Sequence, residues 1–192
     1  GVITSIAAAH LDGFGSIGNI EKEKKSILYH STKEYNFNEL KPNSLAINFK
    51  EHKSNIFIKN LEIASHVAND IFKDCNFHDL NGDLLINCLE SFKMPPGRGE
   101  ILSLNKVKII DDSYNANPES VRAALDHLSC FEEYRKFFVF GDMKELGDDE
   151  ENFHTEVGQY AVEKADILFT VGKLAKNAQS NSNNFALSLH FN

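Results

Sequence analysis

The sequence lacks any apolar run as long as a membrane span, which needs about 18–20 residues. It also lacks a block of Lys and Arg, and its formal net charge over 192 residues is −8. An acidic chain without a basic patch does not match a nucleic-acid-binding surface. We therefore expect no membrane insertion and no nucleic-acid partner.

Cysteine is scarce: Cys75, Cys88 and Cys130 are the only three, and no C-x-x-C pair occurs. Widely spaced cysteines in an odd number favour free thiols in a reducing compartment and give no metal-binding framework. The apolar run Val2–Ala8 has no charged residues before it, so a signal peptide is not predicted. We expect a soluble cytoplasmic protein. Because the first residue is Gly1 and a predicted strand starts at once, we also expect a piece of a longer chain.

A dinucleotide fingerprint is missing too, because no G-x-G-x-x-G follows a predicted strand. Apolar runs at 107–110, 136–140 and 166–171 nevertheless alternate with segments of helical periodicity. Strand–helix alternation with short connections favours a parallel sheet with right-handed crossovers. The fold class predicted for this half is therefore α/β, Rossmann-like, with a mostly parallel sheet. Its other elements would be helices over 118–128 and 149–165, a polar loop over 176–184 and a strand over 185–189.

The stretch 111–120, Asp-Asp-Ser-Tyr-Asn-Ala-Asn-Pro-Glu-Ser, lies between a predicted strand and a predicted helix. The β-branched run 107–110 before it predicts a buried, parallel strand. After it, Asn117 is a candidate N-cap and Pro118 fits the first helical position. Open α/β sheets bind ligands at the carboxyl ends of parallel strands. From these residues alone, two interpretations are equally open: a turn that binds a ligand, and a turn that only caps the helix and exposes its acidic residues to solvent.

Polar residues also follow the first apolar run, in the glycine-containing loop His10–Ser16. His10 and Asp12 are candidates for holding a divalent cation or a phosphate, and a structural histidine is the alternative. A helix is predicted from about residue 17 to residue 29. Lys24 lies about two turns into it, so its ammonium either folds back toward the loop or stays solvated.

The segment 94–100, Met-Pro-Pro-Gly-Arg-Gly-Glu, predicts a stiff, non-helical connector. We place a domain boundary here, with domains over 1–98 and 99–192. Arg98 at this boundary is either a ligand contact or an exposed linker residue. Within the first domain, the pattern predicts a short strand at 45–47 and helices beginning at residue 58 and spanning 80–92.

Several motifs, in a consistent order, resemble the Mur ligases. They are Ala-Ala-Ala-His-Leu-Asp-Gly-Phe-Gly-Ser at 7–16 with Lys24, D-D-S-Y-N-A-N-P at 111–118, and G-D-M-K-E-L-G at 141–147 followed by His154. The resemblance is closest to the members that join D-alanyl-D-alanine to UDP-N-acetylmuramoyl-tripeptide. It implies part of a central ATPase domain followed by part of a C-terminal Rossmann-like domain.

The resemblance assigns catalytic and metal-binding roles to His10 and Lys24. In the family the histidine is a Mg²⁺ ligand, and the lysine is carbamylated so that its new carboxylate helps to hold a second Mg²⁺. Lys25 is the alternative if the register slips by one residue. Carbamylation makes chemical sense, because Mg²⁺ prefers hard oxygen ligands.

The resemblance also assigns nucleotide-binding residues. Asn60 matches the last position of an H-N-x-x-N motif that reads the adenine, although Ile56 and Phe57 do not match the first two positions. Arg98 matches an arginine that contacts the nucleotide phosphates, and Asp112 matches a ribose-binding aspartate.

Tyr114 and Asn115 would complete the wall that faces ATP. Ser113 and Asn117 would bind the incoming substrate. These roles, like the others, are what the resemblance implies.

The implied reaction is ATP-dependent amide bond formation through an acyl phosphate, in the synthesis of peptidoglycan precursors. ATP and Mg²⁺ would be needed, the partners would be UDP-N-acetylmuramoyl-tripeptide and D-alanyl-D-alanine, and the chain would be a monomer. No G-x-x-x-x-G-K-[ST] phosphate loop occurs in the 192 residues, so we expect the chain to be inactive alone. A related ligase of the folylpolyglutamate or diaminopimelate-adding type and a non-catalytic Rossmann-like binding module are the alternatives.

Overall fold

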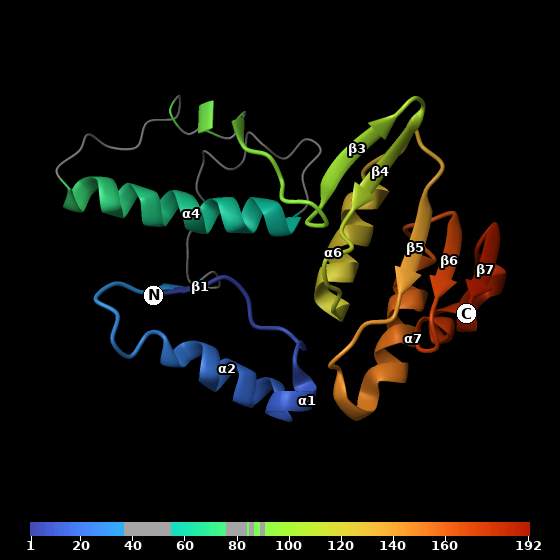
Figure 1. The fold of residues 1–192 in the computed structure, drawn as a ribbon, viewed down its shortest axis with the longest axis horizontal. Coiled ribbons are helices and arrows are strands. Elements are labelled where there is room, and N and C mark those ends of the chain that lie inside the picture. Colours follow the sequence, from blue (N-terminus) through green and yellow to red (C-terminus); the bar gives the residue numbers. More distant parts are fainter. Residues whose placement is uncertain (37–54, 76–83, 85–86, 89–90) are drawn as a thin grey trace. The chain divides into compact units, whose positions relative to one another are not determined.

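The computed structural model describes residues 1–36, 55–75, 84, 87–88 and 91–192 (Figure 1). The strand predicted at 45–47 lies outside these residues, as does much of the helix predicted at 80–92. Its described members are helical: Leu84, Asn87, Cys88 and Ser91. The chain forms two compact units, one from 1–6 and 21–94 and the other from 7–20 and 95–192. The domain boundary at 98 stays a prediction.

In the first unit, a short parallel strand pair accompanies a long helix. Strand β1 (Val2–Ile3) pairs with β2 (Tyr35–Asn36), so the strand predicted over 2–8 is much shorter than expected. Helix α4 (Asn55–Asp74) begins before the predicted start at residue 58. Ile58, Leu61 and Ser65 are buried along it. Their spacing puts them on one face of a helix.

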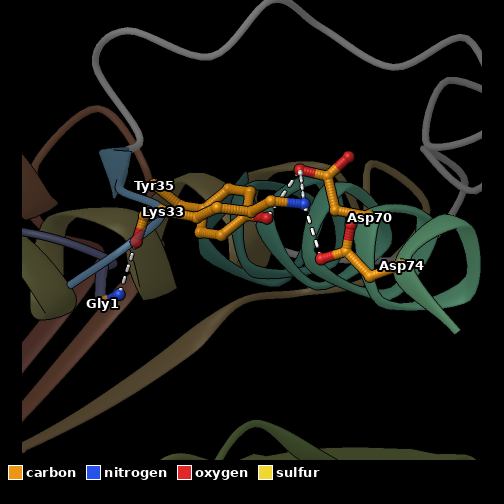
Figure 2. Close-up of polar contacts among 5 residues, drawn as sticks. All are labelled: Gly1, Lys33, Tyr35, Asp70 and Asp74. Atoms are coloured by element: carbon orange, nitrogen blue, oxygen red, sulfur yellow. Dashed lines mark hydrogen bonds and ion pairs between the residues drawn. The ribbon is translucent and has the colours of Figure 1, made fainter.

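A polar cluster at the end of α4 fixes strand β2 to that helix (Figure 2). The Tyr35 hydroxyl donates to Asp70 at 2.6 Å, and the Lys33 ammonium donates to Asp74 at 2.8 Å. The Gly1 ammonium donates to the Lys33 carbonyl at 2.7 Å. The hydrogen bond from Tyr35 lowers the pKa of Asp70, and the bond to Asp74 raises the pKa of Lys33. Because these groups are exposed, each contact contributes little to stability.

The second unit starts with residues 7–20, which include the short helix α1 (Leu11–Phe14) and the first turn of α2 (Ile17–Ser26). Helix α2 ends before the predicted residue 29. In the part of the chain that the structure describes, no helix is both long and apolar enough to cross a bilayer.

An antiparallel hairpin follows the connector. It consists of β3 (Glu100–Leu104) and β4 (Val107–Asp111), with Asn105 at a positive φ of 53° in the turn between them. The prediction of a buried parallel strand at 107–110 was therefore wrong, since Val107 is 56% and Ile109 45% exposed. A short link containing Asn between two apolar runs favours a hairpin.

The parallel sheet lies further along the chain. Strands β5 (Phe137–Gly141), β6 (Ile167–Val171) and β7 (Leu187–Phe191) pair in parallel in the order β5-β6-β7. This sheet confirms the α/β class with a mostly parallel sheet, and each strand lies within two residues of its predicted position.

Helical segments connect these strands. Helix α6 (Pro118–Ser129) precedes β5, and α7 (Glu150–Ala161) joins β5 to β6 after a short 3-10 turn, η2 (Gly147–Asp149). Between β6 and β7 the chain forms a 3-10 helix, η3 (Ala175–Asn184). The polar loop predicted at 176–184 was wrong, because Ala175 and Ala178 of this segment are completely buried.

All of these helices pack on one face of the sheet (Figure 1). The core joins Leu125 of α6, Val157 of α7 and Leu168 of β6. Helix α7 and η3 approach closely: a Cβ atom placed on Gly158 would lie 2.1 Å from the carbonyl oxygen of Ala178. Glycine at 158 therefore allows two backbones to touch.

The opposite face of the sheet is apolar and exposed. Its side chains alternate with those of the core along each strand. The exposed fractions run from 43% to 67% for Phe137, Val139, Val171, Leu187, Leu189 and Phe191. Parallel sheets are usually covered on both faces, and here the helices of the second unit cover one.

Candidate functional site

The connector after residue 94 is bonded to the end of the hairpin. The Gly99 N–H donates to the Asp111 carbonyl at 2.8 Å, and the Tyr114 N–H donates to the Gly97 carbonyl at 3.0 Å. Gly97 has a φ of 72°, and a Cβ atom there would lie 3.1 Å from the Tyr114 nitrogen. The glycine thus lets the connector lie directly against the motif at 111–120.

This arrangement brings together Arg98, Asp112 and Tyr114, three of the predicted nucleotide-binding residues. The Arg98 guanidinium carbon lies 3.7 Å from the centroid of the Tyr114 ring, and this ring is 69% exposed. Partial burial removes water from the Asp112 carboxylate and raises its pKa, and the positive charge of Arg98 opposes that rise. Asp112 nevertheless remains accessible to water. A cation, an aromatic face and a carboxylate therefore share one exposed surface.

Asp111 organises the turn beside this cluster. Its Oδ1 accepts from the Ser113 hydroxyl at 2.6 Å and from the Ser113 N–H at 3.2 Å. These hydrogen bonds lower the pKa of Asp111. Ser113, predicted to bind substrate, therefore uses its hydroxyl within the turn.

The two predicted asparagines also serve the local fold. The Oδ1 of Asn115 accepts from the Ala116 N–H at 2.9 Å. Asn117 caps α6: its Oδ1 accepts from the Ser120 N–H at 3.0 Å, and the Ser120 hydroxyl accepts from the Asn117 N–H at 3.1 Å. The predicted N-cap at Asn117 and first-turn position of Pro118 are confirmed.

Replacing Asn117 with alanine should lower the free energy of unfolding by about 1 kcal/mol, because the cap of α6 is lost. Asn117→Ser should retain most of the stability, since serine is also a good N-cap. Urea unfolding followed by circular dichroism measures both. Equal losses in the two variants would show that the capping oxygen is not what stabilises the helix start.

The loop after β5, residues 141–147, is bonded to the loop after β6. Asp142 Oδ1 accepts from the N–H groups of Leu174 and Ala175 at 3.0 and 2.8 Å. A Cβ atom on Gly172, whose φ is 106°, would lie 2.4 Å from that same oxygen. The two strand-end loops are thus joined through one carboxylate.

His154, in helix α7, holds the loop 141–147 in place through a hydrogen bond to its backbone. Its ring is completely buried. Its Nε2 accepts from the Met143 N–H at 2.9 Å, so the proton sits on Nδ1, which donates to the Glu150 carbonyl at 2.6 Å. Both ring nitrogens are therefore used in holding the fold.

His10, a predicted metal ligand, lies in the second unit and meets Glu145 of this loop. Its Nδ1 contacts the Glu145 carboxylate, and the Leu11 N–H donates to the Glu145 carbonyl at 2.8 Å. Across the described ranges of the chain, no three His, Cys, Asp or Glu residues are grouped so that they could hold a metal ion.

The remaining predicted site residues belong to the first unit. The Lys24 ammonium donates to the Ser5 carbonyl at 3.0 Å, so it folds back toward the segment that leads into the His10 loop. Lys25, the alternative, forms an ion pair with Glu21 at 2.6 Å. Asn60 is exposed on α4. The structure therefore divides the predicted site residues between its two units.

Sequence reasoning missed Asp111 and Glu145 as individual site residues. Asp111 was visible as the first residue of an Asx-type turn, because a serine follows two positions later. Glu145 carried no such signal: its partner His10 is 135 residues away.

Residues 97–188 match the family model described as Mur ligase, glutamate ligase domain. The UDP-N-acetylmuramoyl-tripeptide--D-alanyl-D-alanine ligase of Bacillus subtilis is 43% identical over 89 residues, covering 45% of this chain and 20% of the relative. The ligase of the same name from Haemophilus influenzae is 29% identical over 206 residues, covering 83% of this chain and 43% of the relative.

Solved structures show the same fold. A MurF ligase from Thermotoga maritima in complex with ADP matches with a TM-score of 0.76 at 20% identity, over 98% of this chain and 52% of that one. MurF from Acinetobacter baumannii matches with a TM-score of 0.74 at 20% identity, over 99% and 49%. The chain thus spans about half the length, or less, of these relatives.

Proposed function

We propose that the chain serves an ATP-dependent ligase of the Mur ligase family, whose glutamate ligase domain is matched by residues 97–188. The reaction would join D-alanyl-D-alanine to UDP-N-acetylmuramoyl-tripeptide, the reaction named for its relatives. The product would be a peptidoglycan precursor, made in the cytoplasm by a monomeric enzyme. The observation that carries this proposal is the cluster of Arg98, Asp112 and Tyr114 within the matched residues.

In the proposed reaction, the tripeptide carboxylate attacks the terminal phosphorus of ATP, the phosphoanhydride bond breaks and ADP leaves. The amine of D-alanyl-D-alanine then attacks the acyl phosphate, an amide bond forms and inorganic phosphate leaves. Enzymes accelerate such steps mainly by positioning the reactants and by stabilising developing charge. The second unit would supply part of that positioning.

Each member of the cluster has a chemical role in nucleotide binding. The Arg98 guanidinium would pair with phosphate oxygens, which planar donors match well. The Asp112 carboxylate would accept hydrogen bonds from the ribose hydroxyls. The exposed Tyr114 ring would form part of the wall beside the nucleotide, together with Asn115. Ser113 and Asn117 would lie on the substrate side.

Mg²⁺ would neutralise charge on the phosphates when it is bound. His10 fits such a role in part, because its Nδ1 is engaged by Glu145 and its Nε2 has no partner among the residues that the structure describes. Lys24 would become an oxygen ligand only after carbamylation, and Asn60 would contact the adenine.

Isothermal titration with ATP and Mg²⁺ tests the proposal by binding rather than turnover. We expect binding to weaken by ~10-fold or more in Arg98→Ala and in Asp112→Ala, because each removes a charge-assisted hydrogen bond. Arg135→Ala is the matched control, since it removes an exposed arginine whose guanidinium carbon lies 5.9 Å from the ring centroid of Phe137 in β5. A flat titration with the unmodified chain would instead favour a non-catalytic module or a fragment without a complete nucleotide site.

The amine substrate that the enzyme accepts distinguishes this proposal from related ligases. Product formation should require D-alanyl-D-alanine when the complete ligase is supplied with ATP, tripeptide precursor and one amine at a time. Turnover with glutamate or diaminopimelate and none with D-alanyl-D-alanine would point to another member of the family.

A further inference from the structure

Two residues with unusual backbones meet in the second unit. His10 has a φ of 58° and Glu145 a φ of 61°. A left-handed conformation is uncommon for residues other than glycine; asparagine, aspartate and histidine adopt it more often than the rest, and glutamate does not share that preference. Backbones of this kind persist where the surroundings enforce them, and they gather at functional sites. Asn105, also left-handed, is accounted for by the hairpin turn.

The two loops contact each other through both backbone and side chains. The Leu11 N–H donates to the Glu145 carbonyl at 2.8 Å, and the Glu145 carboxylate faces His10 Nδ1. A Cβ atom on Gly147 would lie 3.7 Å from an Asp12 carboxylate oxygen. The contact therefore extends over several consecutive residues of each loop.

Glu145 is exposed, but the residues on both sides of it are fixed in the core. Met143 is completely buried and bonded to His154, and Leu146 is 1% exposed. The carboxylate is thus presented by a loop anchored before and after it. Rigid support of this kind is what a positioning group needs.

We propose that Glu145 is a positioning residue for His10: its carboxylate holds the proton on Nδ1 and so presents the Nε2 lone pair to the divalent cation of the nucleotide site. In metal sites, the ring nitrogen that does not bind the metal usually donates to a carboxylate or carbonyl, and this fixes the tautomer and the ring orientation. The inference rests on the proposed function, because it gives His10 its cation. The inference goes beyond the proposed function by assigning the orientation of His10 to a loop within residues 97–188, the part that matches the glutamate ligase domain.

An exposed ion pair without functional consequence is the competing explanation, since such pairs contribute little. The two explanations differ in the state of the histidine ring. An ion pair requires an imidazolium with a proton on both nitrogens, whereas a positioning carboxylate holds a neutral ring with its proton on Nδ1 and a free lone pair on Nε2.

The first measurement is nitrogen NMR of the histidine rings in the full 192-residue chain without metal. We expect His10 to carry its proton on Nδ1 in the unmodified chain and to shift toward the Nε2–H form in Glu145→Gly. Glycine suits the left-handed backbone, so this variant should fold. Glu145→Gln, which keeps an acceptor oxygen, should retain an intermediate proportion. An unchanged tautomer in Glu145→Gly would overturn the proposal.

The second measurement is titration with the Mn²⁺ complex of ATP, whose phosphates supply further ligands to the cation. Mn²⁺ prefers ligands similar to those of Mg²⁺. Loss of an outer carboxylate typically weakens metal binding by ~10- to 100-fold, and we expect such a loss in Glu145→Gly. Glu133→Ala, which removes an exposed carboxylate from another turn, should bind like the unmodified chain. Equal affinity in all three proteins would reject the positioning role. Absence of Mn²⁺ binding in the unmodified chain would count against the proposed function, and the tautomer measurement would then decide the role of Glu145.

Discussion

Replacing Gly158 with alanine should destabilise the second unit by a net of about 1–2 kcal/mol. A Cβ atom at this position would lie 2.1 Å from the Ala178 carbonyl oxygen and 2.5 Å from its Cα. These are backbone atoms, so the strain can be relieved only by moving η3 away from α7. Overpacking of this kind typically costs about 1–3 kcal/mol, which outweighs the ~1 kcal/mol by which alanine favours a helix interior over glycine.

Gly18→Ala provides the control for that experiment. Gly18 is also helical, and an added Cβ would meet only the Ser16 hydroxyl oxygen at 3.8 Å. We expect this variant to be as stable as the unmodified chain or slightly more stable, because only the propensity effect remains. Urea unfolding with a probe in the second unit measures both. If Gly158→Ala unfolds at the same urea concentration as the unmodified chain, α7 and η3 do not touch in solution.

Replacing His154 with alanine should lower the free energy of unfolding by about 3 kcal/mol or more. The substitution removes a completely buried ring that lies 5.4 Å, centroid to centroid, from Phe140. It also leaves the buried Met143 N–H without its acceptor. An unsatisfied buried donor costs about 1–3 kcal/mol, and the cavity adds to that cost.

His154→Phe separates these two contributions, because it fills the space but offers no acceptor nitrogen. We expect it to lose about 1–3 kcal/mol, less than His154→Ala. Thermal unfolding of the three proteins gives the comparison. A phenylalanine variant as stable as the unmodified chain would mean that the loop after β5 does not depend on the bond to Met143.

Local features of the fold could be predicted from the sequence. Asn117 and Pro118 marked the start of α6 because a capping bond joins residues only three apart. Strands β5 and β6 were found because their apolar runs are nearly continuous and bounded by polar loops. The segment η3 was missed, since its buried residues are alanines, whose small side chains produce little contrast with the polar residues around them.

Features that depend on distant residues could not be predicted in this way. The run at 107–110 is mostly β-branched and apolar, which favours a buried strand. In the structure it pairs with β3 in a hairpin, and its side chains are largely exposed. The contact between His10 and Glu145 depends on left-handed backbones at both residues, and the sequence does not reveal these conformations. Arg98 and Tyr114 came together because Gly97 allows a close approach, which only the folded chain reveals.

The close approach of Asp142 and Gly172 has a consequence for how this sequence can change over time. The Asp142 carboxylate occupies the space that a side chain at 172 would fill, and it accepts hydrogen bonds from the N–H groups of Leu174 and Ala175. A mutation at either position alone therefore damages both loops. We therefore expect a substitution at residue 142 or residue 172 to be tolerated only together with a compensating substitution at the other position.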